Sequence, residues 1–327
     1  MISSQPQPSP LVTVGIPFYN AQQTLADAIR SVFAQTLTDW ELILVNDGSA
    51  DGSLDIAASI ADSRVRVVSD GRNLGLSARL NQIARLARGR YLARMDADDL
   101  MHRDRLDAQS GFLSRRPEVD VVGSGMFILD ESGRLVGKRL PPMDISARAV
   151  LMKGAFAHAT IMGKVDWFRG NPYDSAFDGC EDRELWLRSF ARSRFANIPE
   201  CFYYCAEYNS FSLKNYTTRC RRHARAYRKH APALAGWGMT AALVCRQKFK
   251  SAIYTLAVTA GLENRLLSRR SQPLTSDELA GALQVLQLVR STALPLLSER
   301  NAGVPSPSSG PAAKEQPLSV HAIDEQL

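Results

Sequence analysis

The chain has few of the features that mark secreted or membrane-spanning proteins. Residues 1–10 are rich in Ser, Pro and Gln and have neither a basic start nor an apolar core, so we expect no signal peptide. Arg246, Lys248 and Lys250 interrupt the longest apolar candidate, residues 236–262, before it approaches the roughly 20 residues that cross a bilayer. We therefore expect a cytoplasmic protein, and peripheral attachment to the inner face of the plasma membrane stays open.

Cysteines are also few. The chain has 5 of them, an odd number, and no Cys-x-x-Cys pair. We therefore expect neither a disulfide framework nor a zinc site, and a reducing compartment suits this composition.

Glycine-rich nucleotide-binding loops are missing. The turn after the first expected strand reads Ile16-Pro17-Phe18-Tyr19-Asn20, without the glycines of a dinucleotide-binding turn, and no Gly-Lys-Ser/Thr loop occurs. Residues 46–52 resemble a calcium loop, but its closing Glu would fall at Ala58, which excludes that interpretation.

Acidic residues are absent from residues 208–262, which hold ten Lys or Arg. Subtracting ten from the net charge of +7 leaves −3 for the rest, so the basicity is local. Three interpretations compete: a solvated helix face, a segment attracted to anionic lipid, and nucleic-acid binding. We keep an anionic membrane surface as a candidate partner and expect no nucleic-acid partner.

The first hundred residues alternate between strand-like and helix-like segments. Strands are expected at residues 12–16, 40–45, 65–69 and 90–95, and amphipathic helices lie between them, the third closed by Gly89. This alternation predicts an α/β fold with a mainly parallel sheet flanked by helices. The chain of 327 residues is 45% hydrophobic, enough to bury a sizeable core.

The pattern changes after residue 99. We expect a helix over residues 103–116, a hairpin from residues 119–129 and 135–140, and a helix over residues 183–191. Residues 209–299 look helical throughout. The expected organisation is a disordered N-terminus (1–10), a catalytic α/β domain (11–208), a basic helical region (209–300) and a disordered tail (301–327).

Polar residues follow each of the first four expected strands. Because ligands bind at the carboxyl ends of strands in open α/β sheets, we expect these residues to converge on one crevice. They are Pro17, Tyr19, Asn20, Asn46, Asp47, Asn73, Asp96, Asp98 and Asp99.

Three carboxylates crowd the end of the fourth expected strand. In an extended backbone Asp96 and Asp98 would share a face, with Asp99 at the following turn. Such carboxylates repel one another, and oxygen-only ligands on a short Asp-x-Asp suit Mg²⁺ or Mn²⁺. A solvated acidic turn is the simpler alternative.

Two further acidic segments have a structural and a functional interpretation. In the functional interpretation of the first segment, Asp47 accepts a hydrogen bond from a nucleotide base. In the structural interpretation, Asp47 belongs to a plain turn in which Asp51 caps the next helix. Glu181 and Asp182 precede a helix, where they are either capping residues or a general base that the helix N-terminus keeps ionised. The same helix dipole would weaken that base unless burial opposes it.

Five segments together resemble glycosyltransferase family 2: residues 12–20, 45–49, 73–76, 93–99 and 181–188. The resemblance covers residues 11–206 and is greatest to inverting enzymes of the GT-A fold that build bacterial surface polysaccharides. It implies a metal-dependent transfer of a sugar from a nucleotide diphosphate donor to a hydroxyl acceptor, with lipid-linked glycans among the candidate acceptors. Mn or Mg is the implied cofactor.

The resemblance also implies residue roles. Asp47 would contact the base, and residues 17–20, with Pro17, Tyr19 and Asn20, would line its pocket together with Asn73. Asp96 and Asp98 would serve the ribose and the metal, and Asp98 and Asp99 would hold the ion. Asp182 would be the catalytic base, with Glu181 in reserve.

The sequence departs from the family in two places. Asn46 stands where an Asp is usual, and residues 206–211 lack the Arg-x-His segment of many relatives. His158 stands where relatives often have a histidine near the acceptor site. A purely structural role for His158 is an equal alternative to a role in acceptor binding. A nucleotidyltransferase and a non-catalytic basic adaptor at a membrane remain alternative functions.

Overall fold

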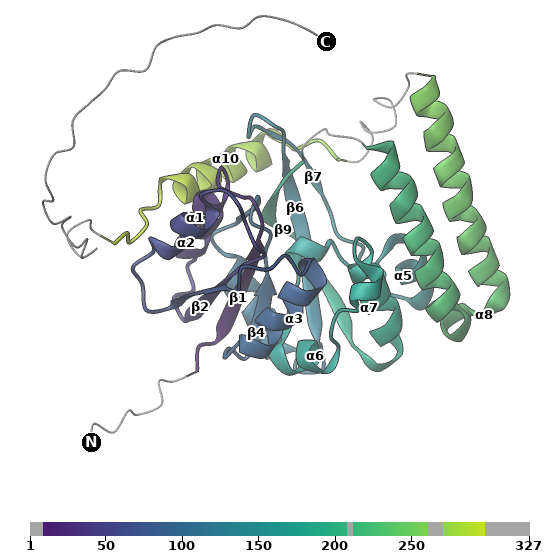
Figure 1. Ribbon diagram of the computed structural model, residues 1–327, viewed down its shortest axis with the longest axis horizontal. Coiled ribbons are helices and arrows are strands. Elements are labelled where there is room, and N and C mark those ends of the chain that lie inside the picture. The colour runs from purple at the N-terminus through teal and green to yellow at the C-terminus, as the bar shows by residue number, and fades with distance from the viewer. Residues whose placement is uncertain (1–8, 208–211, 261–270, 298–327) are drawn as a thin grey trace, which may run out of the picture. The chain divides into compact units, whose positions relative to one another are not determined.

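Four parallel strands form the first half of the sheet. The computed structural model describes residues 9–207, 212–260 and 271–297. Its first strands pair in the order β3-β2-β1-β4, and every pairing is parallel. They are β1 (Val12–Phe18), β2 (Trp40–Asn46), β3 (Val65–Ser69) and β4 (Tyr91–Arg94), shown in Figure 1. The predicted strand–helix alternation is confirmed in this half.

The second half of the sheet is mixed. It continues from β4 in the order β8-β6-β9-β5, and β7 pairs with β6 in the predicted hairpin. Only the β6–β9 pairing is parallel there. The strands are β5 (Leu100–Met101), β6 (Val121–Leu129), β7 (Leu135–Arg139), β8 (Met162–Lys164) and β9 (Phe195–Ala206).

Sequence reasoning did not predict β5, β8 or β9. Two of them are only two or three residues long, and β9 contains Pro199 and Glu200, which obscure any alternation. Their pairing is therefore decided by partners distant in the sequence.

Helices cover both faces of the sheet. Leu42 and Leu44 of β2 pack with Leu25 of α1 (Leu25–Phe33) and with α4 (Arg105–Arg115), whereas Ile43 and Val45 pack on the opposite face. This second core contains residues of α3 (Leu76–Leu86), α5 (Ala147–Lys153), α6 (Val165–Gly170), α7 (Glu181–Ser189) and α8 (Leu213–Thr259). Alternating strand side chains thus supply two cores. The short α2 (Ser53–Ala58) lies beside α1.

Gly89 does not close α3, which ends at Leu86. It instead allows the chain to approach β1, where its N–H donates to Thr13 Oγ1 at 2.9 Å. Thr13 in turn donates to Glu41 Oε1, whose carboxylate pairs with Arg88 at 2.8 Å. A Cβ at Gly89 would lie 2.5 Å from the backbone nitrogen of Thr13. Only glycine therefore fits at this position.

The C-terminal region is helical with interruptions. The backbone of α8 leaves helical geometry at Gly236, whose φ is +76°, so this helix has two parts. The prediction of continuous helix over residues 209–299 is wrong for residues 271–275, where Gln272 pairs with Lys138 of β7, and for residues 292–297, where Leu296 pairs with Ile60. After the bridge at Gln272, α10 (Ser276–Ser291) begins with a capping box of Thr275 and Glu278.

All the named helices and strands belong to one unit of the chain, residues 1–296. The domain boundary at residue 208 stays a prediction. Residues 1–8 of the expected N-terminal disorder and the expected tail, 301–327, lie outside the described residues. Within the described ranges no helix is both long enough and apolar enough to cross a membrane.

Gly89→Ala should lower the free energy of unfolding by about 1–3 kcal/mol, because the new methyl group overpacks against the backbone of β1. Gly281→Ala is the matched control. Gly281 lies within α10 with no atom within 4 Å of a built Cβ, so alanine should stabilise by about 0.5–1 kcal/mol. Urea denaturation of the three proteins measures both effects, and equal midpoints for Gly89→Ala and the wild type would contradict the steric argument.

Candidate functional site

One cavity of about 950 Å³ opens at the carboxyl ends of the parallel strands. Loops after β1, β2, β3 and β4 contribute to its walls because parallel strands end at the same edge of a sheet. Its volume lies within the range of about 300–1,000 Å³ that is typical of small-molecule sites. Seven residues singled out in the sequence line it: Pro17, Tyr19, Asn20, Asp47, Asn73, Asp96 and Asp98.

Hydrogen bonds join the loops after β1 and β2. The Asn20 N–H donates to Ser49 Oγ at 3.0 Å, and the Gln22 N–H donates to Asp51 Oδ2 at 3.0 Å. Asp51 also accepts from the N–H of Ser53, the first residue of α2, but the N-cap position of this helix is Gly52, one residue later than expected. Asn20 has a φ of +49°, which asparagine tolerates better than most residues. These contacts fix one rim of the cavity.

Asp47 is buried and already well hydrogen-bonded. Its Oδ1 accepts from the Leu74 N–H at 2.7 Å and from Arg79 Nε at 2.8 Å, and its Oδ2 accepts from the Gly75 N–H at 3.1 Å. Arg79 is fully buried and also pairs with Asp70 at 2.6 Å. A carboxylate has about four lone-pair sites, so roughly one remains for a ligand. Asp47 thus holds the loop after β3 against the end of β2.

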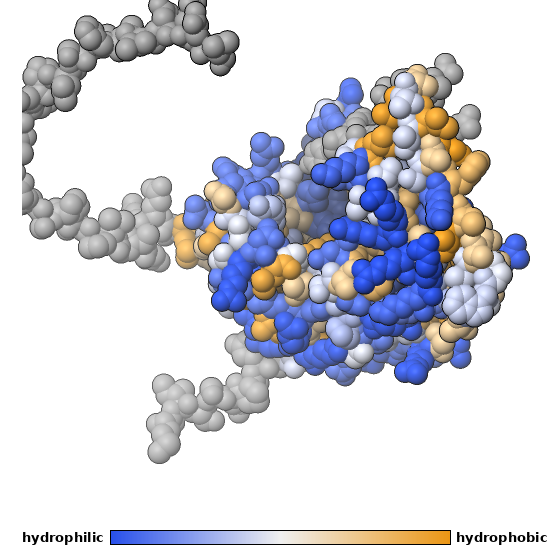
Figure 2. All heavy atoms as spheres, turned by 45° about the vertical axis from the view of Figure 1, so that its right-hand side comes forward, coloured by the Kyte–Doolittle hydropathy of each residue, from blue (hydrophilic) through white to orange (hydrophobic). Residues whose placement is uncertain are grey.

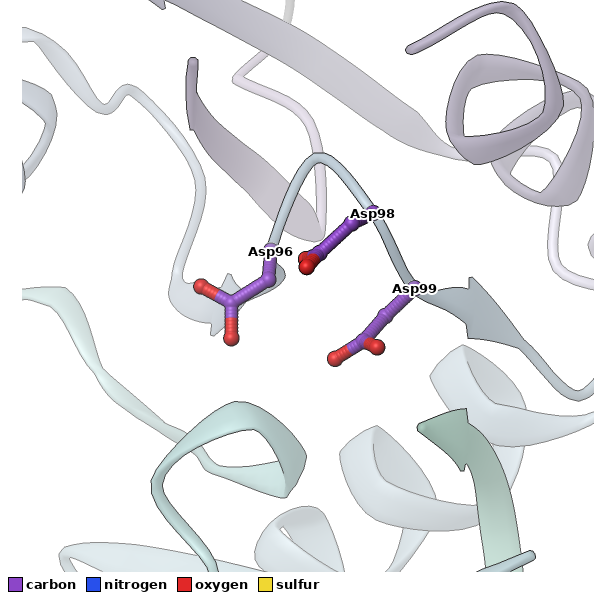
Figure 3. Close-up of side chains that lie close together, drawn as sticks. All are labelled: Asp96, Asp98 and Asp99. Carbon is purple, nitrogen blue, oxygen red and sulfur yellow. The ribbon is translucent and has the colours of Figure 1, made fainter. Parts of the chain in front are cut away.

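The three clustered aspartates lie on the turn between β4 and β5. Because β4 ends at Arg94, the expectation that Asp96 and Asp98 share a strand face is wrong. The turn nevertheless brings one oxygen from each carboxylate within 4.8 Å of the others, and Figure 3 shows the three side chains leaving the loop toward the same space. Asp98 is exposed, Asp96 is half-buried, and Asp99 is 3% exposed.

Burial and like charges act together on this cluster. Burial, with the charges of Asp96 and Asp98, raises the pKa of Asp99 well above its ordinary value. Burial and Asp96 also raise the pKa of Asp98. Asp99 cannot turn away, because its Oδ1 accepts from the Ala206 N–H at 2.8 Å. Among the described residues this is the one acidic or His/Cys group with metal-ligand spacing, and its oxygen ligands suit Mg²⁺ or Mn²⁺.

Two buried arginines lie behind the cluster. Arg94 donates from Nη2 to Asp96 Oδ1 at 2.5 Å, and although burial opposes its charged form, Asp96 raises its pKa. Arg105 is fully buried and donates from Nη2 to the carbonyl oxygen of Arg94 at 2.9 Å. Burial lowers the pKa of Arg105 to about 10. Both guanidinium groups therefore remain charged at neutral pH and partly offset the carboxylates.

The predicted base and its reserve lie in the first turn of α7, which begins at Glu181, two residues before the expected start. Asp182 is half-buried and Glu181 is buried. Burial and the charge of Asp182 raise the pKa of Glu181, whose Oε1 lies 3.9 Å from His158 Nδ1. His158 Nε2 is 2.9 Å from the Tyr173 hydroxyl. Burial and Arg94 lower the pKa of His158 well below its ordinary value, so it is neutral at pH 7.

Glu181 and Asp182 are not among the residues that line the cavity. Tyr173 lies within electrostatic range of both the aspartate cluster and the acids of α7. Burial raises the pKa of Tyr173 and Arg94 opposes this shift, whereas the charges of Asp182, Glu181 and Asp96 increase it.

Arg79, Arg94 and Tyr173 were missed by sequence reasoning. A charged residue inside a strand that is buried on both faces requires a partner, so Arg94 carried a signal that could have been used. Arg79 and Tyr173 carried none, because their partners are distant in the sequence. Asn73 and Tyr19 line the cavity, but their contacts with a ligand stay predictions.

Residues 13–170 match the family model for glycosyl transferase family 2. The putative glycosyltransferase EpsE of Bacillus subtilis is 36% identical over 217 residues, which cover 64% of this chain and 77% of EpsE. The Escherichia coli protein WfgD, a UDP-Glc:alpha-D-GlcNAc-diphosphoundecaprenol beta-1,3-glucosyltransferase, is 28% identical over 198 residues, which cover 61% of this chain and 76% of WfgD.

The fold is similar to that of a solved mannosyltransferase. The structure of PcManGT from Pyrobaculum calidifontis, in complex with GDP-Man and Mn²⁺, superposes with a TM-score of 0.53 and covers 86% of this chain and 85% of PcManGT. At 18% identity this likeness shows the fold alone, and the predicted GT-A architecture is confirmed.

A divalent cation should stabilise the protein through the aspartate cluster. Mn²⁺ at a hundred times its dissociation constant should add about 2.7 kcal/mol to the free energy of unfolding, seen as a higher melting temperature. Asp98→Asn should lose most of this gain, and without metal it should melt higher than the wild type because it removes one of three repelling charges.

Asp27→Asn is the matched control, because Asp27 lines the hollow next to Asp98 and Asp99 but is outside the cluster. It should respond to Mn²⁺ as the wild type does. A full response of Asp98→Asn in differential scanning calorimetry would show that the ion binds elsewhere.

Proposed function

The chain belongs to glycosyltransferase family 2, and from this premise we propose that it transfers a sugar from a nucleotide diphosphate donor to a hydroxyl acceptor with inversion. The observation that carries the proposal is the cavity at the ends of four strands, with Asp96 and Asp98 of the aspartate cluster on its wall. As a glycosyltransferase, the protein is neither the nucleotidyltransferase nor the non-catalytic adaptor that the sequence left open.

The donor would occupy the 950 Å³ cavity. Tyr19 is 52% exposed, so its ring is free to cover a nucleotide base, with Pro17 and Asn20 on the same rim. The remaining lone-pair site of Asp47 would accept from the base, and Asn73 would contribute a further polar contact. The names of two relatives support a nucleotide-sugar donor, since WfgD uses UDP-Glc and PcManGT was solved with GDP-Man.

Asp98 and Asp99 would hold Mn or Mg, and Asp96 and Asp98 would contact the ribose. The raised pKa values of Asp98 and Asp99 fit a site that takes a cation, because a nearby positive charge removes the cost of their repulsion. When bound, such an ion supplies positive charge that neutralises a diphosphate leaving group. PcManGT was solved with Mn²⁺, which supports this choice.

Asp182 would take the proton from the acceptor hydroxyl. It is half-buried in the first turn of α7, so an acceptor can reach it. The acceptor oxygen then bonds to the anomeric carbon on the face opposite the departing diphosphate, which inverts that carbon. Glu181 is the reserve candidate, since it is buried and its Oε2 has no hydrogen-bond partner.

The acceptor would be a hydroxyl of a lipid-linked glycan. The name of WfgD specifies a GlcNAc-diphosphoundecaprenol acceptor, and that protein is 28% identical to this chain. We accordingly place the enzyme in the synthesis of a bacterial exopolysaccharide, O-antigen or capsule.

The proposed function is tested by incubating the purified chain with Mn²⁺, UDP- or GDP-sugars and polyprenyl-diphosphate-linked sugars. We expect release of the nucleotide diphosphate together with a glycosylated lipid whose new linkage has the inverted anomeric configuration by NMR. A product with retained configuration would overturn the mechanism, and transfer of a nucleotidyl group would overturn the function.

Asp182→Asn should lower kcat by about 10²–10⁴-fold with little change in the KM for the donor, because general-base catalysis contributes about this factor. Glu181→Gln should have a smaller effect. Asp166→Asn serves as the control, since the Asp166 side chain is 92% exposed on α6 and should be dispensable. If initial-rate measurements show a larger loss of kcat for Glu181→Gln than for Asp182→Asn, Glu181 is the base and Asp182 is not.

A further inference from the structure

The helix α8 is unusually basic and folds back on itself. It contains ten Lys or Arg and no acidic residue. Its two parts lie side by side across Gly236, because the rings of Tyr216 and Tyr254 stack with centroids 3.9 Å apart. The second part, residues 237–259, turns one face inward through Thr240, Leu243, Val244 and Gln247, which are all buried.

The outward face of this second part is apolar. Trp237 is 74% exposed, Phe249 and Leu256 are each 68% exposed, and Ile253 is 39% exposed. Smaller exposed residues with helical spacing complete the face: Ala241, Ala242, Cys245 and Ala252. We call this set the apolar stripe of α8. An exposed stripe of this kind, opposite a buried face, is typical of a surface that binds a partner.

Exposed cations lie on both parts of α8. Lys248 is exposed on the same part of α8, and Arg221 and Arg228 are exposed on the first part. None of these three has an ion pair within the described ranges. Figure 2 shows hydrophobic side chains along the right flank of the molecule beside a hydrophilic surface. Apolar side chains flanked by cations are the pattern of helices that lie in a membrane interface.

We propose that α8 docks on the surface of an anionic bilayer, with the apolar stripe at the boundary of the acyl chains and the cations near the headgroups. Charge complementarity favours this occupant, because no acidic residue of α8 would repel the lipid. A second copy is a poorer occupant, since pairing two α8 helices would bring twenty cations together without an acid between them. This inference goes beyond the proposed function and does not depend on it.

The docking surface is attached to the part of the protein that holds the candidate base. α8 packs against α7, and Arg225 of α8 donates from Nη1 to the carbonyl oxygen of Ala176 at 3.0 Å. Lys229 pairs with Asp174 at 3.4 Å. Both contacts reach the segment that precedes α7, so docking through α8 would keep that segment near the lipid surface.

The experiment is co-sedimentation of the full chain with vesicles of phosphatidylglycerol and phosphatidylcholine, and with vesicles of phosphatidylcholine alone. The wild type should bind the anionic vesicles at least tenfold more tightly, and high salt should weaken that binding. Equal binding to both vesicles, or none to either, would overturn the proposal.

Two pairs of variants separate the stripe from the cations. The double variant Phe249→Ser with Leu256→Ser should lose at least tenfold in binding, whereas Val136→Ser with Met143→Ser, at residues 53% and 58% exposed elsewhere, should not. Arg221→Gln with Lys248→Gln should lose about fivefold per cation. Arg85→Gln with Arg192→Gln removes the same charge from other exposed positions and should change binding little.

Nucleotide diphosphate release without vesicles is measured in parallel and should be unchanged in all these variants, so a failure of docking is distinguishable from a failure of the proposed enzyme. Light scattering tests the alternative occupant, a second copy of the chain, by measuring the oligomeric state. A wild-type dimer that Phe249→Ser with Leu256→Ser converts to a monomer would make the stripe an interface between copies and overturn membrane docking. Equal losses in a variant pair and its control would also overturn it.

Discussion

Repulsion among the carboxylates of Asp96, Asp98 and Asp99 is the constraint on which the rest of the site depends. Three like charges within 4.8 Å of one another are stable only if the surrounding protein, and in our proposal a divalent cation, compensates them. Arg94 and Arg105 supply two positive charges from behind the turn, and Arg94 pairs directly with Asp96. The protein therefore offsets the cluster incompletely, and the pKa values of Asp98 and Asp99 remain raised.

The cluster also depends on strands that are distant in the sequence. Asp99 accepts from the backbone of Ala206, the last residue of β9, and the Asp96 N–H donates to the Tyr203 hydroxyl of the same strand at 3.1 Å. The mixed half of the sheet thus holds the turn that follows the parallel half. Loss of the β5–β9 pairing would release this turn, although no residue of either strand lines the cavity.

On the donor side, predicted ligand residues also hold the loops together. Asn20 and Asp47 engage neighbouring loops through hydrogen bonds within the protein itself. The cavity is consequently preorganised, which lowers the entropy that binding must overcome. On the side of α7, Glu181 lies beside the neutral His158, and burial together with the charge of Asp182 raises its pKa. Asp182 is the more exposed of the two adjacent acids, which is why we favour it as the base.

Local sequence patterns were sufficient for the parallel half of the fold and for the identity of the acidic cluster. Apolar runs with a period of two or 3.6 residues indicate strands and helices, and parallel strands end at one edge of a sheet. The residues at 17–20, 47, 73, 96 and 98 could therefore be assigned to one crevice, whereas Asn46 and Asp99, which were also expected there, do not line it. Only the tertiary structure decided three other features. They are the pairing of strands β5, β8 and β9, the partners of Arg79 and Arg94, and the outward direction of Phe249 and Leu256. The physical reason is that each of these depends on contacts between residues far apart in the chain, and such contacts leave no periodic trace in the sequence.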